Sequence, residues 1–153
     1  MSIPYQRLDH APVFTCEQAA QMVPDHDAGE TKNLFIKDKK GRRHFLVSVD
    51  YGKSVDLKAL GRQLGMAGLS LASPERLKQH LNVAPGSVTL LSVINDEQGQ
   101  VEVILDQDLM CHQALACHPL VNTATLLIPL SHLLRFLEET GHKPKVMDIP
   151  ARK

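Results

Sequence analysis

Short apolar runs separated by polar, turn-forming residues recur along this chain and predict a protein rich in β-strands. The apolar runs are residues 33–38, 43–50, 87–94, 101–106, 121–128 and 145–149. Lys39-Lys40-Gly41 separates the first two runs, which predicts a β-hairpin. Residues 95–99 contain Asn, Asp and Gly, so we expect a turn there and antiparallel pairing of the runs on either side of it.

Helix signals occupy the stretches between these runs. Helices are predicted to begin after Thr15, Asp56, Ser73 and Pro129, where a capping residue or a first-turn proline precedes apolar residues at helical spacing. Gly65 and Gly141 are predicted to end the second and fourth of these helices, and the polar residues 24–29 to form a loop. Strands and helices do not alternate strictly. We therefore expect one α+β domain over residues 1–153, with a mixed, largely antiparallel sheet and packed helices.

The balance of charge excludes a broad basic surface. The chain has 17 Lys and Arg against 17 Asp and Glu, so its formal net charge is zero. Any contact with a nucleic acid must then come from a local group of cations. The densest such group surrounds the predicted hairpin and comprises Lys37, Lys39, Lys40, Arg42 and Arg43. We interpret it as a contact to a nucleic-acid backbone, although a charged hairpin tip is more often simply solvated surface.

Cysteine usage and hydropathy favour a cytoplasmic protein with reduced thiols. The chain has three cysteines, no apolar run at its N-terminus of the kind a secretory signal needs, and no stretch near the roughly 18 apolar residues of a membrane span. Cys111-His112 and Cys117-His118 suggest a metal site, but their spacing fits none of the usual zinc sites. We predict no metal and no cofactor, and interpret the cysteines as packing residues.

Three segments carry a resemblance to a known family. They are residues 31–38 (TKNLFIKD), 85–96 (PGSVT to IND) and 118–125 (HPLVNTAT). Together with residues 10–15 and 133–142, they resemble, in the expected order, the prolyl-tRNA editing family. These are the YbaK/ProX-like domains related to the insertion domain of bacterial prolyl-tRNA synthetases. The resemblance implies the fold of those domains and hydrolysis of the ester that joins an amino acid to the terminal ribose of a tRNA.

The resemblance also implies roles for particular residues. Lys32, the lysine regarded as essential in relatives, is expected to act in catalysis together with Gly86 and His118, and Thr31, Asn33 and Ser87 to bind the substrate. An ammonium group can hold a phosphate or stabilise charge on a carbonyl oxygen. Glycine lets backbone N–H groups approach the ester closely, and a histidine can act as a base near neutral pH. Without the resemblance, a surface lysine, an ordinary turn and a packing histidine would explain the same residues.

The family pattern indicates the reaction more clearly than the identity of the amino acid that is removed from the tRNA. The forms of the first two segments are most similar to the alanine-specific branch, so we expect Ala-tRNA(Pro) as the substrate. Leu90 stands where the family often has proline, and esters of cysteine, serine or threonine remain alternatives. A second alternative is a non-catalytic module of the same fold that binds tRNA or a synthetase. Expected partners are the acceptor end of a mischarged tRNA and prolyl-tRNA synthetase. We expect the protein to be a monomer that does not associate with a membrane.

Overall fold

The computed structural model describes residues 6–9, 31–117 and 124–152. Four predicted features lie outside the described residues: the helix after Thr15, the loop at 24–29, the first residues of the apolar run at 121–128, and His118. Within the described ranges, no helix is both long and apolar enough to cross a membrane.

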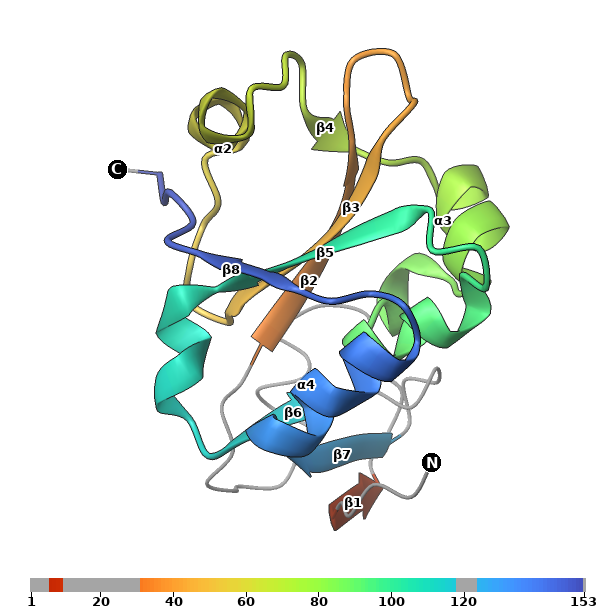
Figure 1. The fold of residues 1–153 in the computed structure, drawn as a ribbon, viewed down its shortest axis with the longest axis vertical. Helices are drawn as coiled ribbons and strands as arrows, with labels where there is room; N and C mark the ends of the chain where they lie inside the picture. Colours follow the sequence, from red (N-terminus) through yellow and green to blue (C-terminus); the bar gives the residue numbers. More distant parts are fainter. Residues whose placement is uncertain (1–5, 10–30, 118–123, 153) are drawn as a thin grey trace.

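The larger of two sheets has five strands in the order β4-β2-β3-β5-β8 (Figure 1). Its strands are β2 (Thr31–Lys37), β3 (His44–Asp50), β4 (Ser70–Leu71), β5 (Val101–Asp106) and β8 (Lys145–Met147). The strands β4, β2 and β3 pair antiparallel, whereas β3, β5 and β8 pair parallel. The predicted hairpin is confirmed, and its turn is closed by Asp38 N–H donating to Arg43 O, with Gly41 at a φ of 69°.

The second sheet has three antiparallel strands in the order β1-β7-β6 and lies at the lower end of the molecule in Figure 1. Its strands are β1 (Gln6–Asp9), β6 (Ala114–Cys117) and β7 (Ala124–Pro129). The predicted α+β class is confirmed, and most strand pairs are antiparallel. The strands are divided between two sheets, however, whereas the sequence led us to expect one.

Three α-helices follow the predicted capping signals: α2 (Leu57–Leu64), α3 (Pro74–Leu81) and α4 (Leu130–Glu139). The Asp56 side chain accepts from Ala59 N–H, and the Ser73 side chain accepts from Arg76 N–H. These bonds satisfy amide donors that a helix start otherwise leaves unpaired. Gly65 ends α2 in the left-handed conformation, as predicted.

The predicted strand over residues 87–94 is wrong. The chain forms two 3-10 helices there, η1 (Pro85–Ser87) and η2 (Leu90–Asn95). Thr89 and Ser92 form a capping box, in which each side chain bonds the backbone of the other residue. Leu90 and Val93 are fully buried three residues apart, a spacing that a 3-10 helix places on one side. Since residues 87–94 form no strand, β5 pairs parallel to β3 and β8 instead.

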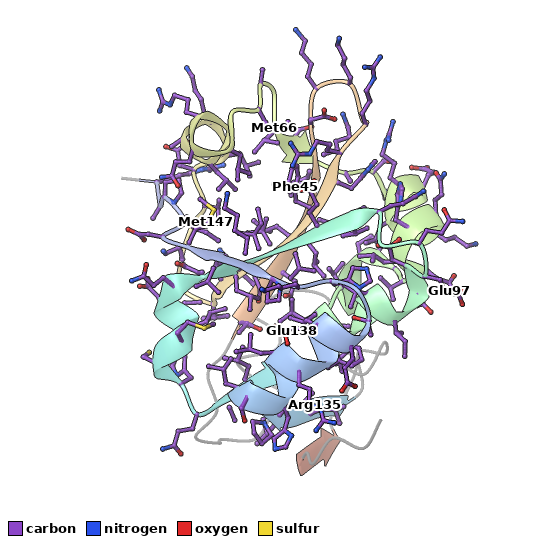
Figure 2. All side chains as sticks on the ribbon, viewed as in Figure 1. Phe45, Met66, Glu97, Arg135, Glu138 and Met147 are labelled. Carbon is purple, nitrogen blue, oxygen red and sulfur yellow. The ribbon has the colours of Figure 1, made fainter. Side chains whose placement is uncertain are left out.

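Buried side chains form two clusters, one on each face of the five-stranded sheet. Phe35 and Leu46 face the cluster that includes α3, α4 and η2, whereas Ile36 and Phe45 face the cluster that includes Leu60 of α2. Figure 2 shows side chains filling both spaces. Successive residues of a strand point to opposite faces, so β2 and β3 contribute to both clusters.

A cluster around His44 joins the hairpin to α3. The His44 ring is buried, stacks on Phe35 with centroids 5.5 Å apart, and lies 4.1 Å from the His80 ring. Arg76 Nη1 lies 3.2 Å from His44 Nε2 and donates to Gly41 O at 3.3 Å. Burial, reinforced by the nearby His80 and Arg76, lowers the pKa of His44 to about 4. The ring is therefore neutral at pH 7, and its Nε2 accepts a hydrogen bond from Arg76 Nη1.

This pKa predicts a loss of stability in mild acid. An unfolded histidine has a pKa of about 6.5, so between pH 6.5 and 4 the unfolded chain binds more protons than the folded one. The contribution of His44 to stability is then complete above about pH 6.5 and is lost as the pH falls toward 4. His44→Phe keeps the stacking but cannot titrate. Urea unfolding followed by circular dichroism from pH 4.5 to 7.5 should show a steeper decline for the wild type, and parallel declines would contradict the assignment.

Candidate functional site

The beginning of β2 contacts the second family segment and the end of β6. Thr31 Oγ1 donates to Ala116 O at 3.3 Å, and Asn33 Nδ2 donates to Val88 O at 3.5 Å. Ala116 lies in β6, two residues before His118, and Val88 directly follows Ser87. Thr31 and Asn33 therefore connect the start of β2 to two other parts of the chain. One is the segment that contains Gly86, and the other is the strand that precedes residues 118–125.

Strand geometry separates Lys32 from its two neighbours. Thr31 and Asn33 lie on the same face of β2 as Phe35, toward η1 and β6. Lys32 is paired with Val49 and by alternation shares the opposite face with Leu34. Asn33 is therefore adjacent to Lys32 in the chain without lying beside it in space. A partly exposed ammonium on a flexible four-carbon stem can still reach around the end of a strand.

The glycine-containing turn supplies fewer backbone donors than its sequence suggests. Gly86 and Ser87 lie in η1, and Ser87 N–H donates to Ala84 O at 2.9 Å. This donor is used inside the turn, so it is not available to an incoming ester oxygen. The Val88 carbonyl accepts from Asn33, which connects the turn to the strand that carries Lys32.

Ser48 is a polar residue of this region that the sequence analysis missed. It lies directly opposite Asn33 in the β2–β3 pairing and is fully buried. Among the residues that the structure describes, neither Ser48 Oγ nor Asn33 Oδ1 has a hydrogen-bond partner. The available signal was a serine within the apolar run HFLVSV, but a buried serine often serves only to pack.

The thiol of Cys117 is not a nucleophile at neutral pH. Cys117 ends β6 and is buried, and burial raises the pKa of its thiol to about 12. The thiolate is the reactive form of cysteine, so this residue stays inert. Cys111 is exposed, and its Sγ donates to Asp108 O at 3.0 Å. Within the described ranges, no three His, Cys, Asp or Glu side chains lie close enough together to hold a metal ion.

The predicted nucleic-acid patch lies at the other end of β2. Seven residues at roughly 3.3 Å each place the two ends of β2 about 20 Å apart. Lys39, Lys40 and Arg42 are exposed at the hairpin tip, where Figure 2 shows long side chains projecting away from the body of the protein. Lys37 is partly buried at the end of the strand.

Arg43 differs from the other cations of the patch because it is already paired. Its Nε and Nη2 donate to the two carboxylate oxygens of Glu102 at 2.8 and 2.6 Å. Its guanidinium also lies 5.1 Å from the centre of the Phe45 ring and contacts Met66, both labelled in Figure 2. Arg43 thus contributes little free positive charge. A cavity of about 250 Å³ at this place is lined by Arg43, Lys143 and Lys145 among others, away from the start of β2.

Comparison with known proteins identifies the family. The family model of the aminoacyl-tRNA editing domain matches residues 10–136. The chain belongs to this family. Prolyl-tRNA editing protein ProX of Acetoanaerobium sticklandii is 34% identical to the chain over 149 residues, which cover 97% of this chain and 91% of ProX. Prolyl-tRNA synthetase associated domain-containing protein 1 of Danio rerio is 42% identical over 142 residues, or 92% of this chain and 77% of that protein.

A solved structure supports the fold of this editing domain. It is described as a proposed trans-editing enzyme for prolyl tRNA synthetase, and it superimposes with a TM-score of 0.69 over 95% of this chain and 87% of that chain, at 23% sequence identity. The resemblance inferred from the sequence is therefore confirmed. The family match includes all three segments, whereas the roles of individual residues within them stay predictions.

Proposed function

We propose that this chain is a trans-acting aminoacyl-tRNA editing hydrolase that deacylates mischarged tRNA(Pro). Two hydrogen bonds carry the proposal, within a chain that belongs to the editing family: Asn33 of the first family segment bonds to Val88 of the second, and Thr31 bonds to Ala116, two residues before the third. The printed name of the relative ProX, a prolyl-tRNA editing protein, supports tRNA(Pro) as the substrate.

The proposed chemistry relies on positioned groups rather than on a covalent nucleophile. An aminoacyl ester is already activated, so the protein needs to hold the acyl group, place a water molecule and stabilise the developing oxyanion. The inert thiol of Cys117 agrees with this requirement. In our proposal Lys32, Gly86 and His118 act on the reacting ester, while Thr31, Asn33 and Ser87 hold the substrate.

The proposed substrate is Ala-tRNA(Pro). A small acyl pocket would exclude proline by size, and exclusion of a larger group discriminates more strongly than the loss of a methylene, which is worth about 1–3 kcal/mol. The exposed hairpin would contact the tRNA backbone, with Lys39, Lys40 and Arg42 as its main cations. We further propose that the protein acts as a monomer in the cytoplasm and cooperates with prolyl-tRNA synthetase.

The substrate proposal predicts an ordered preference among aminoacyl esters. tRNA(Pro) charged separately with alanine, cysteine, serine and proline should be deacylated fastest with alanine and not detectably with proline. Release of radiolabelled amino acid under single-turnover conditions measures each rate. A preference for cysteine or serine would reassign the substrate, and no turnover of any of the four esters would favour the non-catalytic alternative.

The role of Lys32 predicts a catalytic loss without unfolding. Removing a group that stabilises a developing oxyanion typically lowers the rate by about 10²–10³-fold, so we expect Lys32→Ala to lose at least about 100-fold in kcat/KM. Thermal unfolding should change little, because the side chain is partly exposed. Lys58→Ala, at an exposed position of α2, is the matched control and should keep wild-type activity. Normal turnover by a folded Lys32→Ala protein would remove this residue from the mechanism.

The hairpin predicts a shallow dependence of tRNA affinity on salt. Each phosphate contact lowers the logarithm of affinity by about 0.7–0.9 per logarithm of salt concentration. Combining Lys39→Glu, Lys40→Glu and Arg42→Glu should raise KM and flatten this slope, with kcat nearly unchanged, because these cations would bind ground and transition states alike. Charge reversal at Lys58, Lys143 and Lys145 is the control. Equal slopes for the two triple variants would show that the tRNA docks elsewhere.

A further inference from the structure

We propose that Ser48 is a positioning residue of the editing site, whose hydroxyl orients the carboxamide of Asn33. The inference rests on the proposed function, because it assigns Asn33 to substrate binding. Ser48 would not touch the substrate itself: its side chain is fully buried in β3, behind the partly exposed Asn33 in β2.

Two polar side chains are paired directly across β2 and β3 in an otherwise apolar environment. Asn33 and Ser48 are cross-strand partners, and such side chains point to the same face with Cβ atoms about 4.5–5.5 Å apart. The next pair along the strands on this face is Phe35 with Leu46, both buried in the larger core cluster. An apolar residue at position 48 would fit these neighbours, so the serine is a departure from the pattern around it.

Both side chains also keep an unused hydrogen-bonding atom in the interior. Ser48 Oγ and Asn33 Oδ1 are buried, and neither is bonded to another residue of the described part of the chain. A buried polar atom that lacks a partner destabilises a folded protein, and native proteins keep few of them. The hydroxyl can donate and the amide oxygen can only accept, so a hydrogen bond between them would satisfy both atoms together.

The orientation of the Asn33 carboxamide determines which of its atoms faces the turn at Gly86 and Ser87. Asn33 Nδ2 donates to Val88 O, beside the turn that holds Gly86 and Ser87, but the bond is long at 3.5 Å. The terminal torsion of asparagine is broad and nearly two-fold, so this one weak bond fixes the amide poorly. A hydroxyl donor at Oδ1 selects the orientation in which Nδ2 faces Val88. Ser48 thereby sets which atom of Asn33 is offered to an incoming substrate.

The test observes the Asn33 side chain directly. In a ¹⁵N–¹H spectrum, Ser48→Ala should move the Asn33 side-chain NH₂ signals and speed their exchange with solvent. Ser92→Ala is the matched control, because Ser92 is also fully buried but accepts from Thr89 N–H. It should destabilise the protein and leave the Asn33 signals in place. Ser48→Ala should lower the unfolding midpoint, because it leaves the buried Asn33 Oδ1 without its donor. Asn33 signals that do not respond to Ser48→Ala would overturn the proposal, whatever the activity.

A double-mutant cycle adds the functional half of the test. Ser48→Ala should lower kcat/KM about tenfold in the wild type and have no further effect in the Asn33→Ala background. Equal losses in both backgrounds, or full activity of Ser48→Ala, would refute the positioning role. If the wild type deacylates none of the four esters while the Asn33 signals still respond, the editing function fails and the contact between Ser48 and Asn33 stands.

Discussion

The side-chain alternation along β2 is the constraint on which the candidate site depends. Both faces of this strand are covered, with Phe35 in one core cluster and Ile36 in the other. A shift of one residue in its pairing would exchange the two faces and bury the wrong set of side chains. It would also turn Asn33 away from Val88 and Ser48. Apolar burial on both faces of the middle of the strand thus fixes the direction of the polar groups at its beginning.

The far end of the same strand helps to fix its register. The hairpin turn is held by backbone bonds from Asp38 and Gly41 and by the Asp38 carboxylate, which accepts from two further amides. Arg76 then ties the turn to α3 through Gly41 O and His44. These contacts lie about 20 Å from Thr31. Their effect on the site is therefore geometric: they specify the pairing partner of every residue along β2.

A buried ion pair performs a similar task at the end of β5. Lys53 Nζ lies 2.5 Å from Asp106 Oδ2 and 3.2 Å from Asp108 Oδ2, and it donates to Ile149 O at 2.9 Å. Burial opposes the charge on Lys53, but the bonds to the two carboxylates outweigh it and raise the pKa of Lys53. Removing one partner of such a pair leaves the other charge buried and uncompensated, which strongly destabilises the folded protein. The network holds the C-terminal segment against the sheet and so supports the parallel pairing of β8 with β5.

Features encoded by local chemistry could be predicted from the sequence, and features that depend on distant partners could not. The caps at Asp56 and Ser73 and the hairpin at Gly41 each involve only a few neighbouring residues. The capping box of Thr89 and Ser92 is also local, but the β-branched and leucine-rich run around it is equally typical of a strand. The parallel pairing of β5 with β3 joins residues far apart in the chain, as does the bond from Arg43 to Glu102. Ser48 could not be predicted for the same reason, because it becomes a candidate positioning residue only when the strand pairing places Asn33 opposite it.

The length of β2 also separates the electrostatics of the exposed hairpin from those of the candidate site. At physiological ionic strength, interactions between exposed charges are screened over about 8 Å. The start of β2 lies about 20 Å from the hairpin, so Lys39, Lys40 and Arg42 exert little field there. They can attract a polyanion but cannot stabilise charge that develops on an ester at Asn33. Lys32 is the cation that β2 itself places at that end. In the proposed mechanism, an oxyanion formed there would be stabilised in part by Lys32 and by neutral dipoles whose orientation the register of β2 helps to fix.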